Sequence, residues 1–164
     1  MIRILVSRCL FGGEPVRYDG RDKAEKDPRF LKWKEEGRLV PVCPEVEGGL
    51  SVPRPPAQIR DGRAVTEAGK DVTEAYVKGA EAALEKALSE GAAFAVMKQK
   101  SPSCGSRYIY DGTFTGRLKE GKGITAELLT RAGIKVFGED ELKDAAEYLD
   151  SMEKTVNNGE KQGD

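Results

Sequence analysis

The chain has 164 residues, of which 38% are hydrophobic and 34% are charged, and its net charge is −1 at pH 7. This length suits one domain with a single core, and the balanced charge does not point to a protein that grips nucleic acid through a basic surface. The sequence contains three cysteines and no histidine, which excludes serine–histidine and cysteine–histidine catalysis and metal sites built on imidazole.

The apolar stretch nearest the amino terminus, Ile4-Leu5-Val6, is too short for a signal-peptide core or a membrane span. An odd number of cysteines without an export signal fits a reducing compartment, where thiols bind metals or do chemistry more often than they form structural disulfides. We therefore expect a soluble, cytoplasmic protein with no membrane partner.

The first part of the chain predicts a strand–helix–strand unit. Short apolar runs predict strands over residues 2–7 and 39–42, and the first of them leads into a predicted loop over residues 9–13. Residues 27–37 predict a helix, because they combine a capping aspartate, a proline at the first helical position and a glycine at the exit. Residues 44–69 are rich in proline and glycine and predict a long ordered loop or a small hairpin.

The rest of the chain continues this alternation. Its apolar spacing predicts helices over residues 71–91, 125–131 and 139–152, and strands over residues 93–97, 108–110 and 134–137. We therefore predict an α/β fold in which residues 1–152 form a single domain with a mostly parallel, Rossmann-like sheet flanked by helices. The polar residues 153–164 predict a disordered tail.

Cys9, Cys43 and Cys104 each follow a predicted strand, in a predicted loop. Because the carboxyl ends of parallel strands meet at one edge, where open α/β sheets bind ligands, we expect the three thiols to be neighbours in space. Three thiolates there could hold three corners of a [4Fe-4S] cluster and leave one iron without a protein ligand. The intervals of 34 and 61 residues match no compact metal-binding motif, so the alternative is that some of these cysteines are small core residues.

Several ordered blocks resemble the thiouracil desulfidase family, formerly a domain of unknown function. The blocks are residues 6–10, 17–20, 41–50, 53–55, 71–73, 98–106 and 110–114. The resemblance implies that Cys9, Cys43 and Cys104 hold a [4Fe-4S] cluster with one iron lacking a protein ligand. It also implies that this iron captures the sulfur of a thiolated pyrimidine such as thiouracil, which is then released by hydrolysis as hydrosulfide.

The same resemblance implies catalytic roles for Glu45 and Ser101. In a chain without histidine, a carboxylate two residues from a cluster cysteine is a suitable base for deprotonating water, and Glu47 is a weaker candidate for that role. Ser101 could bond the heterocycle or relay a proton, or it could be a turn residue that bonds its own backbone. Arg54 could meet the ligand or form a structural salt bridge.

Two other functions remain open on the sequence. One is a non-catalytic metal-binding or sulfur-carrying module that holds zinc or sulfide on the three thiolates. The other is a thiol redox enzyme with Cys104 as its nucleophile. The expected partner of a desulfidase is a small thiolated pyrimidine, since the balanced charge disfavours a nucleic-acid substrate, although a local basic patch could still bind one.

Overall fold

The computed structural model describes residues 1–162, with side chains described up to residue 156. The central sheet has four parallel strands in the order β2 (Leu39–Val42), β1 (Arg3–Ser7), β5 (Ala92–Met97) and β8 (Lys135–Gly138). The predicted α/β fold with a parallel sheet is confirmed. β1 is an inner strand, flanked by β2 and β5.

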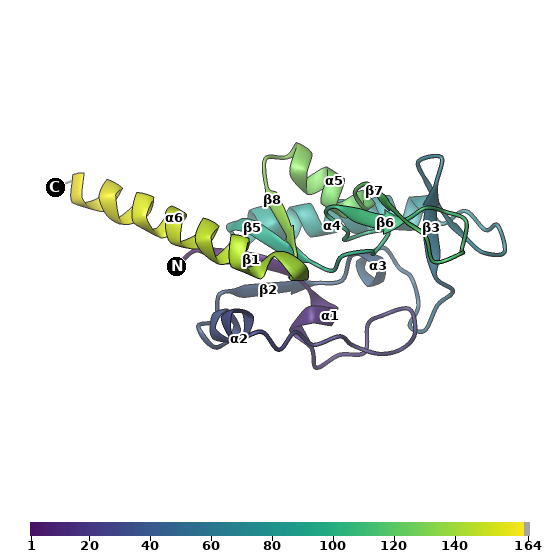
Figure 1. Cartoon of the computed structure of the whole chain (residues 1–164), viewed down its shortest axis with the longest axis horizontal. Coiled ribbons are helices and arrows are strands. Elements are labelled where there is room, and N and C mark those ends of the chain that lie inside the picture. Colours follow the sequence, from purple (N-terminus) through teal and green to yellow (C-terminus); the bar gives the residue numbers. More distant parts are fainter. Residues whose placement is uncertain (163–164) are drawn as a thin grey trace.

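Helices cover both faces of this sheet, as Figure 1 shows. The long elements are α2 (Pro28–Glu35) and α6 (Leu142–Gln162) on one face, and α4 (Thr73–Ser89) and α5 (Ile124–Arg131) on the other. Two antiparallel hairpins lie beyond the carboxyl ends of the sheet strands: β3 (Ala57–Arg60) with β4 (Arg63–Thr66), and β6 (Tyr108–Tyr110) with β7 (Leu118–Glu120). The hairpins therefore stand over the edge where the thiols were expected.

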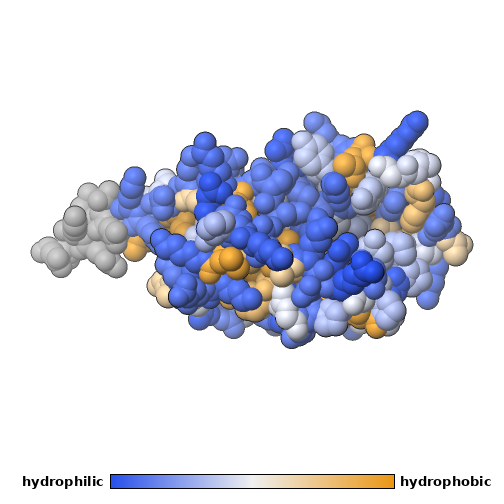
Figure 2. Space-filling model, turned by 60° about the horizontal axis from the view of Figure 1, so that its bottom comes forward, coloured by the Kyte–Doolittle hydropathy of each residue, from blue (hydrophilic) through white to orange (hydrophobic). Residues whose placement is uncertain are grey.

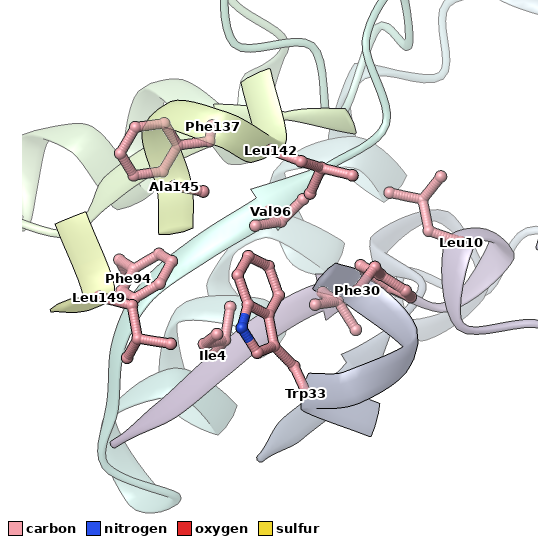
Figure 3. Close-up of a cluster of buried hydrophobic side chains, with 11 residues drawn as sticks. Ile4, Leu10, Phe30, Trp33, Phe94, Val96, Phe137, Leu142, Ala145 and Leu149 are labelled. Carbon is pink, nitrogen blue, oxygen red and sulfur yellow. The ribbon is translucent and has the colours of Figure 1, made fainter. Parts of the chain in front are cut away.

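The core has two layers because successive side chains of a strand point to opposite faces of a sheet. On one face, the residues shown in Figure 3 include Ile4 and Phe94 of the sheet, packed with Trp33 of α2 and Leu142 and Leu149 of α6. The other layer joins strands to α4 and α5 through Leu5, Val40, Val42, Ala83, Ala87, Ala95, Met97 and Leu129. Burial on both faces explains why the strands read as continuous apolar runs.

The surface is mainly hydrophilic. In Figure 2 the hydrophobic groups on the visible face are separated by polar ones. Among the helices of residues 1–162, none combines the length and the apolar character needed to cross a membrane.

Three local predictions need correction. The predicted loop over residues 9–13 is wrong for Cys9, which lies in the one-turn helix α1 (Arg8–Phe11), closed by a bond from the Gly12 amide to the Arg8 carbonyl. A second one-turn helix, α3 (Pro44–Glu47), begins the predicted loop of residues 44–69, which ends in the predicted hairpin. Such short helices are too brief to show a 3.6-residue apolar period.

The prediction of a disordered tail over residues 153–164 is wrong for residues 153–162, where α6 continues. The segment contains no proline, and Arg38 forms an ion pair with Glu153 at 3.1 Å that fastens the middle of the helix to the domain. The predicted boundary at residue 152 therefore falls inside α6, while residues 163 and 164 lie outside the described residues. A 3-10 turn, Glu139–Glu141, precedes this helix.

Candidate active site

The structure brings the three cysteines to the carboxyl edge of the sheet. Cys9 follows β1 by two residues, Cys43 directly follows β2, and Cys104 lies in the turn region after β5. All three line one cavity of about 490 Å³. The three cysteines therefore converge, as was predicted from parallel strands that end at the same edge of the sheet.

The three thiols are donors that suit a thiophilic metal centre. All three cysteines are free thiols. Within the described residues, no three thiol or carboxylate side chains converge closely enough to hold one metal ion. A tetrahedral zinc, with Zn–S bonds of about 2.3 Å, would require its sulfurs to lie about 4 Å apart. An iron–sulfur cluster attaches each thiolate to a different iron, so it accepts more widely spaced sulfurs.

Burial makes all three thiols weak acids. It raises the pKa of the Cys9 thiol to about 12, and the neighbouring Cys43 adds to this rise, while Lys98 and Arg17 oppose it. Burial is also the main reason why the pKa values of Cys43 and Cys104 are raised. Without metal these groups therefore stay protonated at neutral pH and make poor nucleophiles, which disfavours a thiol redox enzyme. A metal centre held by these sulfurs would need them as thiolates, so its binding would release protons.

Glu45 lies on α3 in the wall of the same cavity. The Tyr76 hydroxyl donates a hydrogen bond of 3.0 Å to its Oε1 atom. Arg54 donates from Nε to Oε2 at 2.8 Å and forms a second bond to the same oxygen from Nη2. The carboxylate is thus fixed from two sides, and Arg54 forms the salt bridge that was one of its two expected roles. Glu47, by contrast, is exposed and does not contribute to the described cavity lining.

Two glycines allow this arrangement. A Cβ atom on Gly79 of α4 would lie 1.8 Å from the carbonyl oxygen of Pro44, and one on Gly48 would lie 2.0 Å from that of Ala75. The backbones of α3 and α4 are therefore in direct contact, which carries Tyr76 of α4 to Glu45. Sequence analysis missed Tyr76, although an isolated glycine inside a helical pattern is a recognisable sign of close packing.

Ser101 is a turn residue whose side chain also lines the cavity. Its Oγ atom accepts hydrogen bonds from the backbone amides of Ser103 at 3.1 Å and Cys104 at 2.9 Å, as a turn residue does. Its side chain also lines the cavity. Because the oxygen is an acceptor in both bonds, the hydroxyl proton is left available to a bound molecule.

Gln99 is a further residue that sequence analysis missed. Its side-chain oxygen accepts the backbone amides of Ser106 at 3.1 Å and Arg107 at 3.2 Å, and its nitrogen donates to the Ser106 hydroxyl at 2.9 Å. The side chain is 4% exposed. Gln99 therefore ties together the two ends of the loop that carries Cys104. This role depends on contacts across the loop, which no local sequence pattern predicts.

The cavity wall is rich in positive charge. Glu45 is the single carboxylate that contributes to the described lining, and Arg54 neutralises it. Five other basic residues line the cavity: Arg8, Arg17, Lys23, Lys98 and Lys100. Lys98 pairs with Glu139 at 2.7 Å, Arg8 with Glu14 at 3.2 Å and Arg17 with Asp19 at 3.8 Å. Among the described lining residues, Lys23 and Lys100 are the cations for which no ion pair is seen, and they can balance part of the charge of bound thiolates or of an anionic ligand.

The fold and the site define an α/β protein with a central parallel sheet and a cysteine-lined cavity. A family model described as 2-thiouracil desulfurase matches residues 4–141. The chain belongs to the 2-thiouracil desulfurase family, which confirms the resemblance found in the sequence.

Two relatives agree with this assignment. The chain is 44% identical over 151 residues to the uncharacterized protein YbbK of Bacillus subtilis (strain 168), a match that covers 86% of this chain and 98% of YbbK. It is also similar to the solved structure of the [4Fe-4S]-dependent thiouracil desulfidase TudS, with a TM-score of 0.88 and 47% identity. That match covers 92% of this chain and 99% of the solved one.

Proposed function

We propose that this chain is a [4Fe-4S]-dependent thiouracil desulfidase, which removes sulfur from a thiolated pyrimidine by hydrolysis and releases hydrosulfide. The observation that carries the proposal is the convergence of three free thiols and a fixed carboxylate on one cavity. Membership of the 2-thiouracil desulfurase family and the similarity to TudS support the same activity. The free thiols also fit the reducing cytoplasm that the sequence predicts.

Cys9, Cys43 and Cys104 would hold the cluster through three thiolates, so that one iron lacks a protein ligand. When bound, the cluster would supply a thiophilic, electrophilic iron that polarises a thiocarbonyl and exposes its carbon to attack by water. The chain's own residues must then supply the proton transfers and the orientation of the substrate.

Glu45 is the proposed base. The hydrogen bonds from Arg54 and from the Tyr76 hydroxyl hold the orientation of the carboxylate. A fixed carboxylate in the cavity wall can take a proton from the attacking water without first reorganising. The attack on the thiocarbonyl carbon therefore depends on Glu45.

Ser101 is the proposed contact to the heterocycle. Two backbone amides fix its oxygen at the cavity wall. Its proton can then be donated to a ring nitrogen or oxygen of the pyrimidine, or to the departing sulfur. This contact would orient the thiocarbonyl relative to the three thiolates.

The substrate is proposed to be a small thiolated pyrimidine. The cavity volume of about 490 Å³ lies within the range of small-molecule sites. Lys23 and Lys100 of the lining could meet partial negative charge on the substrate. A nucleic acid is the less favoured partner, because the net charge of the whole chain is −1.

Anaerobic reconstitution with iron and sulfide, followed by incubation with 2-thiouracil, 4-thiouracil and RNA containing 4-thiouridine, tests the proposal. We expect a brown protein that consumes the thiocarbonyl absorbance of a free thiouracil and releases hydrosulfide. Replacing any one of the three cysteines by serine should abolish the reaction. A protein that purifies anaerobically with stoichiometric zinc and no labile sulfide would overturn the proposal, and turnover that survives Cys9→Ser would indicate thiol chemistry instead.

A further inference from the structure

Gln58 lies in the cavity wall opposite the sheet strands. It belongs to β3, whose hairpin lies beyond the carboxyl ends of those strands. Its side chain is half-buried and contributes to the cavity lining. Arg54, which holds Glu45, precedes it in the same stretch of chain. The proposed mechanism nevertheless gives Gln58 no role.

Two backbone amides fix the orientation of the Gln58 side-chain amide. Its Oε1 atom accepts the amides of Gly112 and Phe114, each at 3.1 Å. Both partners are N–H donors, so the oxygen and not the nitrogen has to face them. No hydrogen bond from Nε2 to the described residues is seen, and no fully buried side-chain nitrogen or oxygen among them lacks a partner. The Nε2 atom therefore reaches accessible space with its hydrogens free.

The loop that holds Gln58 is itself held in place. It connects β6 to β7, and Arg60 donates two hydrogen bonds to its Gly112 carbonyl, at 3.1 Å from Nε and 2.6 Å from Nη2. A Cβ atom on Gly112 would lie 2.7 Å from the carbonyl oxygen of Ile59, so the loop backbone packs directly on β3. Gln58 is thus a donor fixed in the cavity wall before a ligand binds.

We infer that Gln58 selects uracil-type over cytosine-type thiopyrimidines: its Nε2 group donates a hydrogen bond to the oxo group that a thiouracil carries in addition to its thiocarbonyl. This inference rests on the proposed function and narrows its substrate class. A 2-thiocytosine carries an amino group in place of that oxo group, and two donors cannot bond each other. The unpaired donors left by the wrong base would create the selectivity.

Three variants separate recognition from support of the loop. Gln58→Glu keeps an oxygen for the two backbone amides and replaces the donor by an acceptor, which suits an amino group. Gln58→Met removes the donor and the acceptor at similar size. Arg60→Met is the matched control, because Arg60 supports the same loop but does not contribute to the described cavity lining.

The test uses the full-length protein, reconstituted anaerobically, with iron and labile sulfide counted in every variant. Hydrosulfide release gives kcat/KM for 2-thiouracil and for 2-thiocytosine, and isothermal titration with the products uracil and cytosine measures binding without turnover. We expect the wild type to prefer the uracil-type member of each pair. Both Gln58 variants should lower this preference by about tenfold or more, and Gln58→Glu should also gain activity on 2-thiocytosine. Arg60→Met should keep the wild-type preference.

An unchanged preference in the Gln58 variants would overturn the inference and leave Gln58 a support for the loop. An equal loss in Arg60→Met would overturn it too, since a displaced loop would then explain the result. Should Gln58→Glu fail to take up iron, Gln58→Met decides.

Failure of the proposed function would look different. A wild-type protein that releases no hydrosulfide but binds uracil more tightly than cytosine, through Gln58, would overturn the proposed function and keep the recognition. A wild-type protein with neither turnover nor uracil binding would overturn both.

Discussion

Glu45 is held by two partners that come from different parts of the chain, Arg54 from the proline-rich loop and Tyr76 from α4. Both partners donate hydrogen bonds to the carboxylate. The orientation of Glu45 is thus set before any ligand binds. This preorganisation is what a general base needs, since the cost of ordering the group is already met in folding.

Glu45→Gln tests that role. The amide keeps the size and some hydrogen bonds of the carboxylate but cannot act as a base, so we expect turnover to fall by about a hundredfold or more. The visible absorption and iron content of the cluster should stay at wild-type values. Glu47→Gln is the matched control, because this neighbour is exposed, and it should keep full activity. Equal turnover in the two variants would transfer the base role to another group.

Ser101→Ala separates the two roles of this serine. Loss of the hydroxyl removes the proposed contact to the heterocycle and also leaves the Cys104 amide without its acceptor. We expect activity to be lost while the cluster still forms, with faster loss of iron to a chelator than in the wild type. Single-turnover assays and chelation kinetics measure both effects. Full activity in the variant would reduce Ser101 to its turn role.

At the scale of elements, the sequence predicted the strands and helices that have a periodic apolar pattern. It did not predict the one-turn helices or the contacts between distant segments. The apolar runs and the cap residues located the four sheet strands and α2, α4 and α5, because each leaves several regularly spaced residues. The meeting of the three cysteines at one edge of the sheet was predicted from the parallel strand topology alone. The one-turn helices could not be predicted, since a single turn has no period, and the partners Tyr76 and Gln99 depend on contacts between distant segments.

The contact between α3 and α4 makes a specific prediction for Gly79→Ala. The added methyl group meets the Pro44 carbonyl, so the helices must separate, at a cost of about 1–3 kcal/mol in stability. Because α3 carries Glu45, kcat should fall as well. Thermal melts and turnover per iron-loaded protein measure the two effects.

Gly91→Ala provides the control for this change. Gly91 follows α4 with a φ of 67° and has open space where a Cβ atom would lie. Alanine there costs roughly 1–2 kcal/mol through backbone strain but does not move α3. The control should therefore lose stability and keep its turnover. If both variants keep full turnover, the close helix contact is not needed to place Glu45.

At the scale of the whole molecule, the fold stands largely apart from the cluster site. Two apolar layers hold the sheet from both faces. Cys104 is a buried member of one layer and Cys9 packs against the other, but most of the core is built from aliphatic and aromatic side chains. A chain of this length buries enough surface to fold without a metal. It differs in this from small metal-dependent domains, which unfold when the metal leaves.

We therefore expect the protein to remain folded after its iron is removed with a chelator. Far-UV circular dichroism should keep its shape, and the thermal transition should stay cooperative but move to a lower temperature, because the bound cluster no longer favours the folded state. The same melt on the triple cysteine-to-serine variant is the control, and it should not respond to chelator. An unfolded spectrum after chelation would contradict this account.

The order of the cysteines along the chain limits when a cluster could be inserted during synthesis. β1 and β2 leave the ribosome early, but the third thiol follows β5 and is held in place by a loop that also contacts the segment after β8. A half-made chain therefore offers at most two of the three sulfurs. A full set of three sulfur ligands therefore exists only after β5 and the loop that follows it have been made.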